Sequence, residues 1–320
     1  MKKILITGAA GFIGFYSSLK FSKSDHVVGI DNINNYYSQK LKKDRIKILK
    51  KNKNFKFYKV DIKDSKNLEK IFIKYKPDIV LNLAAQAGVR YSLKYPKKYL
   101  SNNIDGFFNI LEYCKKYDVK LLMYGSSSSV YGLKSKGPFK ESSSTDKPIS
   151  IYAATKKTNE MMAEVYNHLY GLKCVGLRFF TVYGPWGRPD MALYDFVSKI
   201  LTKKKITVYN KGNLLRDFTF IDDIVTSIIK LSKLRSDKFN NLILNIGNSK
   251  PVLLNSFIKE IEKNLKINAN IKYEPLPRSD VKITHSNSKK LYSLIKSRPN
   301  TNYKTGIKKF IDWYKKHYQV

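Results

Sequence analysis

The chain has 320 residues, of which 42% are hydrophobic, and this is enough to bury a sizeable core in one large domain or two smaller ones. The formal charge of +36 suggests an anionic partner, but the lysines are spread along the whole chain, which favours a solvated basic surface over a nucleic-acid site. No apolar run approaches the length of a membrane span and the four histidines lack metal-ligand spacing, so we expect no membrane, no nucleic acid and no metal.

Two features bear on the compartment. Cys114 and Cys174 are the two cysteines and form no C-x-x-C pair, so we expect small buried side chains in a reducing cytoplasm. The apolar start faintly resembles a signal peptide. Its cleavage would remove the first strand and the glycine turn described next, so we expect it to be retained.

The chain begins with a predicted strand at residues 4–6, and residues 12–22 predict a helix. Between and within them, Gly8, Gly11 and Gly14 form a G-x-x-G-x-x-G pattern. Gly8 would allow a tight turn, Gly11 a close approach of the backbone to a pyrophosphate, and Gly14 close packing of the helix on the sheet. Because a helix N-terminus offers free N–H groups and a partial positive charge, this stretch predicts a dinucleotide-binding turn.

A second apolar run at residues 27–30 ends on Asp31 and Asn32. This is about 20 residues beyond the glycines, where the dinucleotide fingerprint has its carboxylate. The Asp31 carboxylate would accept hydrogen bonds from the adenosine ribose hydroxyls and would repel a 2′-phosphate. We therefore expect NAD as the cofactor.

Strands and helices then alternate. The sequence predicts strands at residues 55–60, 79–83, 121–124 and 174–180, and helices at residues 97–117 and 152–170. Such alternation predicts an α/β fold with a doubly wound parallel sheet of the Rossmann type. We expect residues 1–180 to form the NAD-binding domain and residues 181–320 to form mainly a smaller substrate-binding lobe. Shorter elements follow residue 181, and some of them return to the sheet; they include a helix at 221–231, a strand at 242–245 and a final helix at 303–317.

Tyr152 and Lys156 are four residues apart on a predicted helix, so their side chains share one face. An ammonium beside a phenol favours the phenolate, so Lys156 would lower the pKa of Tyr152 and make it a general base for a hydroxyl proton. Lys156 could also bind the nicotinamide ribose. The serines at 126–129 follow the strand at 121–124, at the sheet edge where such folds bind ligands. One of them could pass the proton of the reacting hydroxyl to Tyr152.

Several of these stretches resemble the extended short-chain dehydrogenase/reductase family: residues 7–14, 83–85, 126–132 and 152–156. Within that family the chain is most similar to the group of UDP-glucuronate 4-epimerases. The stretches that carry this similarity are residues 31–37, 84–92, 184–192 and 216–223. The chain departs from the group at Arg278-Ser279-Asp280, where glycine more often precedes the aspartate.

The resemblance implies the roles of individual residues. Ser127, Tyr152 and Lys156 would form the catalytic triad. The NAD-binding residues would be Gly8, Gly11, Phe12, Ile13, Gly14, Asp31, Asn32, Asp61, Ile62, Leu83, Ala84, Ala85, Asn103, Tyr152, Lys156 and Phe180. The substrate-binding residues would be Gly88, Val89, Arg90, Ser127, Ser129, Thr181, Arg188, Arg216 and Arg278. Of the latter, Arg216 and Arg278 would clamp the diphosphate, and Arg188, Ser129 and Thr181 would surround the sugar carboxylate.

The reaction implied is the NAD-dependent C4 epimerisation of UDP-glucuronate to UDP-galacturonate through a 4-keto sugar, which would supply precursors of cell-surface polysaccharides. A UDP-glucuronate decarboxylase and a neutral UDP-sugar 4-epimerase are alternatives that product analysis would separate. A 4,6-dehydratase would carry an Asp-Glu pair where this chain has Ser128 and Ser129. A nucleotide-sensing or nucleic-acid-binding protein on the same fold is the non-enzyme alternative, and the intact triad argues against it.

The helices predicted at 97–117 and 152–170 carry more apolar side chains than one sheet face can cover, among them Phe108, Met161 and Val165. In the family that the chain resembles, two such helices from each subunit form a four-helix interface. We therefore expect a homodimer.

Overall fold

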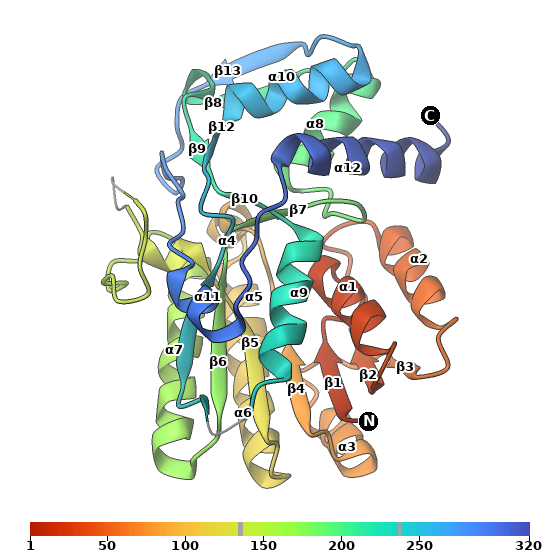
Figure 1. The fold of residues 1–320 in the computed structure, drawn as a ribbon, viewed down its shortest axis with the longest axis vertical. Helices are drawn as coiled ribbons and strands as arrows, with labels where there is room; N and C mark the ends of the chain where they lie inside the picture. Colours follow the sequence, from red (N-terminus) through yellow and green to blue (C-terminus); the bar gives the residue numbers. More distant parts are fainter. Residues whose placement is uncertain (134–136, 236–237) are drawn as a thin grey trace.

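The computed structural model describes residues 1–133, 137–235 and 238–320. A seven-stranded parallel sheet in the order β11-β6-β5-β4-β1-β2-β3 runs through its centre (Figure 1). The strands are β1 (Lys3–Thr7), β2 (His26–Ile30), β3 (Phe55–Tyr58), β4 (Ile79–Asn82), β5 (Leu121–Ser127), β6 (Cys174–Phe179) and β11 (Leu242–Ile246). The predicted α/β class with a doubly wound parallel sheet is confirmed.

Apolar strands form this sheet because helices cover both of its faces. Successive side chains of β1 point to opposite faces, so Ile4 and Ile6 join one buried cluster and Leu5 joins the other. The first cluster packs under α1 (Phe12–Phe21), α2 (Gln39–Leu49) and α9 (Ile221–Ser232). The second packs under α3 (Ser65–Tyr75), α6 (Gly106–Lys116) and α7 (Ile151–Tyr170).

The single helix predicted at 97–117 is a chain of shorter helical segments. After α4 (Val89–Lys94) come α5 (Pro96–Tyr99), a π-helical segment η1 (Leu100–Asp105) and then α6. Asn103 lies in the π-helical segment, and its buried side chain bonds to Gln86 and Thr155. A wider turn of this kind is common at functional sites and is not visible in hydrophobic periodicity.

The residues after β6 build a smaller lobe over the carboxyl ends of the strands, at the top of Figure 1. It contains three two-stranded pairs and three long helices. The pairs are β7 (Thr181–Tyr183) with β10 (Phe218–Phe220), β9 (Leu215–Arg216) with β12 (Val252–Leu253), and β8 (Ile206–Tyr209) with β13 (Ile271–Glu274). The helices are α8 (Ala192–Leu201), α10 (Leu254–Leu265) and α12 (Tyr303–Tyr318).

Three segments of the second half lie away from that lobe. The strand β11 pairs in parallel with β6 and completes the central sheet. The helix α9 contacts α1, and α11 (Lys289–Ile295) contacts both β11 and α9. In the part of the chain that the structure describes, no helix has the length and apolar character needed to cross a membrane.

Candidate active site

A cavity of about 980 Å³ opens between the carboxyl ends of the strands and the smaller lobe. This size suits a dinucleotide or a nucleotide sugar better than a small metabolite. All the predicted cofactor- and substrate-binding residues line it except Asn103 and Arg278. The residues that follow β1, β2, β4 and β5 therefore converge on one cavity with Arg188 and Arg216 of the second half.

The glycine turn has the close approaches that its pattern predicts. Gly8 has a φ of +70°, and a Cβ on it would stand 2.8 Å from the backbone nitrogen of Ala84. A Cβ on Gly14 would collide with the carbonyl oxygen of Gly8. The helix α1 begins after Gly11 with no side-chain cap, and its first residues, Phe12 and Ile13, line the cavity. The N-terminus of α1 thus directs uncapped N–H groups and a partial positive charge to the cavity.

Asp31 stands beside this turn. Its carboxylate accepts hydrogen bonds from the backbone nitrogens of Ile33, at 2.7 Å, and Ala10, at 3.1 Å. Burial raises the pKa of Asp31, while those hydrogen bonds and the charges of Lys42 and Arg45 act to lower it. Two backbone hydrogen bonds therefore hold the Asp31 carboxylate in place beside the turn.

Ser127 and Tyr152 lie together at the end of β5. Ser127 is the last residue of β5, and its hydroxyl accepts hydrogen bonds from the side chain of Ser129, at 2.9 Å, and from its backbone nitrogen, at 3.2 Å. Tyr152 lies in the first turn of α7, which the hydroxyl of Ser150 caps. Burial raises the pKa of Tyr152, although the neighbouring hydroxyl of Ser127 acts to lower it.

The predicted lowering of the Tyr152 pKa by Lys156 is wrong in this structure. Lys156 is buried, and its Nζ donates a hydrogen bond of 2.6 Å to the carbonyl oxygen of Gly125. The ammonium is therefore engaged with β5. Burial lowers the pKa of Lys156 itself to about 8, although the charge of Glu160 acts to raise it.

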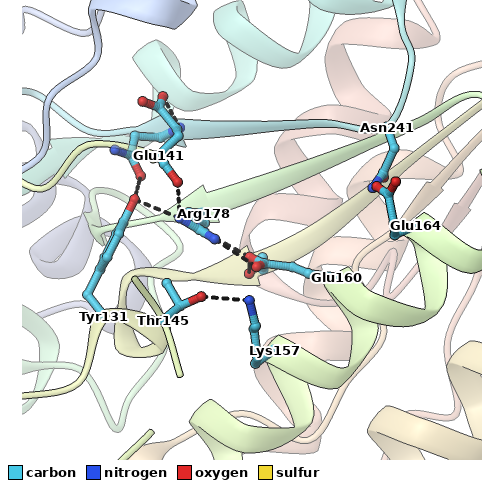
Figure 2. A network of polar contacts seen from close by, with 10 residues as sticks. Tyr131, Glu141, Thr145, Lys157, Glu160, Glu164, Arg178 and Asn241 are labelled. Carbon is cyan, nitrogen blue, oxygen red and sulfur yellow. Dashed lines mark hydrogen bonds and ion pairs between the residues drawn. The ribbon is translucent and has the colours of Figure 1, made fainter. Parts of the chain in front are cut away.

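A buried polar network lies behind this cluster, between α7 and the sheet (Figure 2). Arg178 of β6 binds Glu160 of α7 through two hydrogen bonds of 2.8 Å, and both side chains are at most 5% exposed. Glu160 also accepts a hydrogen bond of 2.6 Å from Ser126. Arg178 continues the network to Tyr131, which donates to Asn245 of β11.

Two features of the sequence are signals for this network, although the predicted site does not include it. Glu160 follows Lys156 by one helical turn, and Arg178 is a lone charge within an apolar strand. A buried charged pair of this kind does little for stability compared with an apolar pair, but it specifies one geometry because each partner needs the other. The pair joins α7, which carries Tyr152, to β6, and the hydrogen bond from Ser126 to Glu160 joins α7 to β5, which carries Ser127.

Asn103 lies beside the cavity without lining it. Its side chain accepts a hydrogen bond from the backbone nitrogen of Gln86 and donates to the Gln86 carbonyl oxygen and to Thr155. Its own carbonyl oxygen accepts a hydrogen bond from Asn159. Asn103 therefore connects the loop after β4 to α7 and stands one layer behind the place expected for it.

Arg188 has a partner that the predicted site does not include. Its guanidinium forms two hydrogen bonds to the carboxylate of Asp190, at 3.0 Å from Nε and 2.5 Å from Nη2. The hydroxyl of Tyr36 donates to the same carboxylate at 3.0 Å. All three residues line the cavity, so the cation predicted to meet the sugar carboxylate is already paired.

Of the two arginines predicted to clamp the diphosphate, Arg216 lines the cavity and Arg278 does not. Arg216 lines the cavity and binds Asp280 at 2.8 Å, and Arg90 approaches the same carboxylate at 3.5 Å. The guanidinium of Arg90 also lies 4.3 Å from the ring centre of Tyr209. Arg278 is exposed and, unlike its neighbours Ser279 and Asp280, does not line the cavity.

Among the residues that the structure describes, no group of three or more His, Cys, Asp or Glu side chains could hold a metal ion. Cys114 and Cys174 are buried and unpaired, and burial raises the pKa of both thiols.

Comparisons with known proteins agree with this geometry. Residues 4–247 match the model of the NAD dependent epimerase/dehydratase family. The chain is 46% identical to Protein CapI of Staphylococcus aureus over 99% of both chains. It is 44% identical to UDP-glucuronate 4-epimerase 1 of Arabidopsis thaliana over 98% of this chain and 77% of that one. It superposes, with a TM-score of 0.93 and 33% identity, on the UDP-glucuronic acid 4-epimerase of Bacillus cereus in complex with UDP-glucuronic acid and NAD, covering 99% of this chain and 100% of that one.

Proposed function

The chain belongs to the NAD-dependent epimerase/dehydratase family, and from this premise we propose that it converts UDP-glucuronate to UDP-galacturonate by inverting C4 of the sugar. One observation carries the proposal. A single cavity brings together the glycine turn, the pair Ser127 and Tyr152, and a guanidinium, Arg188, beside neutral donors. The product would be a precursor of acidic cell-surface polysaccharides.

The residues present fit NAD. The turn at Gly8 and Gly14 leaves no room for a side chain, and the uncapped N-terminus of α1 suits a pyrophosphate. Asp31 lies where the ribose hydroxyls of a bound adenosine would meet a carboxylate. NAD bound there would accept a hydride from C4 of the sugar and later return it.

Tyr152 holds the proton of the reacting hydroxyl. Its Oη takes the proton from O4 as the hydride leaves C4, and it returns the proton after the keto sugar has turned over in the cavity. Ser127 orients O4 and passes the proton to Tyr152, a role that its place beside Tyr152 in the cavity supports. Lys156 stays bound to the carbonyl oxygen of Gly125 at the end of β5, where it is placed to bind the nicotinamide ribose.

The carboxylate of the sugar needs a donor set that is fixed before it arrives, because a carboxylate in a closed site loses its water. Arg188 lines the cavity and is held by Asp190 through Nε and Nη2, so its Nη1 is the part of the guanidinium outside that pair. Ser129 and Thr181 line the cavity as neutral donors. The 4-keto sugar is a β-keto acid, and a carboxylate held out of the perpendicular orientation is protected from loss of CO₂.

The remaining predicted residues take supporting roles in this proposal. Arg216 and Arg90 bind the diphosphate, exchanging part of their contact with Asp280 for phosphate oxygens. Arg278, on the exposed segment beside Asp280, turns inward to complete the clamp. The lobe after residue 180 is mainly the substrate-binding part, and the protein works in the cytoplasm.

A homodimer through α6 and α7 is part of the proposal. These two helices contact each other and leave a row of apolar side chains in solvent. Phe108 is 46% exposed, Met161 59%, Val165 51% and Leu169 60%. Two copies of this helix pair would bury the row against each other, as the family's four-helix interface does.

The decisive experiment is incubation of the purified protein and NAD with UDP-glucuronate, UDP-glucose and UDP-N-acetylglucosamine, each separately, with the products identified by NMR. We expect UDP-galacturonate from UDP-glucuronate and little turnover of the other two. A UDP-pentose would establish a decarboxylase, and a strong preference for UDP-glucose would exclude the glucuronate assignment.

The Arg188→Ala variant tests the carboxylate site. Its affinity for UDP-glucuronate should fall more than its affinity for UDP, and some UDP-pentose should form. An equal loss of affinity for the two ligands, with no pentose, would remove Arg188 from the carboxylate site.

A further inference from the structure

Arg45 is among the largest side chains that the structure buries completely, with 0% of its surface exposed. It lies on α2, and the motifs that indicate the site do not include it. A charged residue is almost never fully buried unless it is paired. The complete burial of the Arg45 side chain therefore needs a structural explanation.

Among the described residues, the guanidinium of Arg45 binds only neutral acceptors. Nη1 donates to the carbonyl oxygen of Ala10, at 2.7 Å, and to the hydroxyl of Tyr37, at 2.8 Å. Nη2 donates to the carbonyl oxygens of Trp186, at 2.6 Å, and Gly187, at 3.1 Å. Its Nε has no partner, and within the described part of the chain no carboxylate forms an ion pair with it.

The three carbonyl acceptors belong to two loops of the candidate site. Ala10 lies inside the glycine turn, between Gly8 and Gly11. Trp186 and Gly187 directly precede Arg188, the residue assigned to the sugar carboxylate. One side chain thus joins segments that stand 35 residues before it and 141 residues after it.

The second of these loops has an unfavourable backbone. Trp186 has a φ of +58°, which is uncommon for a residue with a side chain and persists only where the surroundings hold it. The indole packs against the rings of Phe15, Trp313 and His317, with centroid distances of 5.5, 5.2 and 4.7 Å. The hydrogen bonds from Arg45 hold the carbonyl groups, so the ring cluster and Arg45 together aim Arg188.

A buried cation without a paired anion destabilises a fold unless negative charge lies near it. Asp31 supplies part of that charge, because the positive charge of Arg45 acts to lower the pKa of Asp31. The phosphates expected at the uncapped end of α1 would supply more. Through its hydrogen bond to the carbonyl oxygen of Ala10, Arg45 is thus placed to assist anion binding at the glycine turn.

We propose that Arg45 is a positioning residue that locks the glycine turn and the Trp186–Arg188 loop into one geometry, so that cofactor affinity and recognition of the sugar carboxylate depend on the same guanidinium. The proposal rests on the proposed function for its substrate half and on the glycine turn alone for its cofactor half. The two halves are therefore measured separately.

The test compares Arg45→Met, Arg45→Lys and a control, Leu49→Ala, by isothermal titration calorimetry. Leu49 lies on the same helix, is fully buried and makes no contact of this kind, so its truncation disturbs α2 without breaking the link. One titration gives the dissociation constant of NAD. The other gives, for the NAD-loaded protein, the ratio of the dissociation constants of UDP and UDP-glucuronate.

We expect Arg45→Met to weaken NAD binding about tenfold or more, since charged hydrogen bonds to the turn are lost. We also expect it to bring the ratio of the dissociation constants of UDP and UDP-glucuronate close to one. Arg45→Lys should recover part of the NAD affinity, because it keeps the charge but not the planar fork. Leu49→Ala should lower the melting temperature and leave both quantities unchanged.

Wild-type values of both quantities in folded Arg45→Met would overturn the proposal, and so would equal changes in Leu49→Ala, since the cause would then be packing of α2. If Arg45→Met does not fold, Arg45→Lys decides, and wild-type values there overturn the proposal. If the wild-type protein does not prefer UDP-glucuronate to UDP, the proposed function fails, and the NAD titration alone still decides the role of Arg45.

Discussion

Lys156 carries its charge where water hardly reaches, because only 7% of the residue is exposed. Burial lowers its pKa from 10.5 to about 8, even though Glu160 acts in the opposite direction. A shift of that size means that the protonated lysine lowers the free energy of unfolding by about 3 kcal/mol. The protein thus bears a stability cost at a residue that the proposed mechanism needs.

The sign of the effect sets its pH dependence. Below pH 8 the lysine is charged in the folded and the unfolded chain, and the full cost is present. As the pH rises from about 8 to about 10.5, the unfolded chain binds more protons than the folded one, and the cost disappears. Lys156→Met removes the charge but also the hydrogen bond to Gly125, which is worth about 1 kcal/mol.

We therefore expect Lys156→Met to be more stable than the wild type by about 2 kcal/mol at pH 7 and by less than about 1 kcal/mol at pH 9.5, while losing turnover. Urea unfolding of the NAD-free proteins at both pH values measures this, with the exposed Lys97→Met as the matched control. A variant that is less stable than the wild type at pH 7, or a difference that does not change with pH, would refute the reasoning.

Three further predictions concern the base, the cofactor and the assembly. Tyr152→Phe keeps the ring but loses the proton acceptor, so turnover should fall by about two to four orders of magnitude while NAD still binds; near-wild-type turnover would exclude Tyr152 as the base. Asp31→Ala should weaken NAD binding and reduce discrimination against NADP in direct titrations, and a wild-type preference for NADP would show that Asp31 has been misread. The double variant Met161→Glu with Val165→Glu should be monomeric by light scattering, whereas a wild type that is itself monomeric would contradict the proposed interface.

Short-range patterns carried most of what the sequence revealed. The glycine turn and the Tyr152–Lys156 pair are each defined by spacings of a few residues, so the local backbone geometry is enough to bring the residues within each motif together. The family predicted from these and other stretches is confirmed by the match of residues 4–247. The order of apolar strands and helices along the chain is likewise a local pattern, and it predicted the parallel sheet.

The partners of the site residues could not be predicted in that way. Asp190 neutralises Arg188, and Asp280 joins Arg216 to Arg90, through side-chain directions that no spacing encodes. Arg45 looks in the sequence like one more cation on a basic helix. Its burial depends on a loop 141 residues away, so only the folded chain distinguishes it from the lysines around it.

The position of β11 has a consequence for how the chain reaches its folded state during synthesis. Until residues 242–246 leave the ribosome, β6 presents an unpaired edge, and the hydroxyl of Tyr131 lacks its acceptor on Asn245. At about 5–20 residues per second, this interval lasts roughly 3–13 s. The nascent first half is therefore exposed to edge-to-edge association for seconds, and the strong positive charge of the chain, which makes copies repel one another, would protect it during that time.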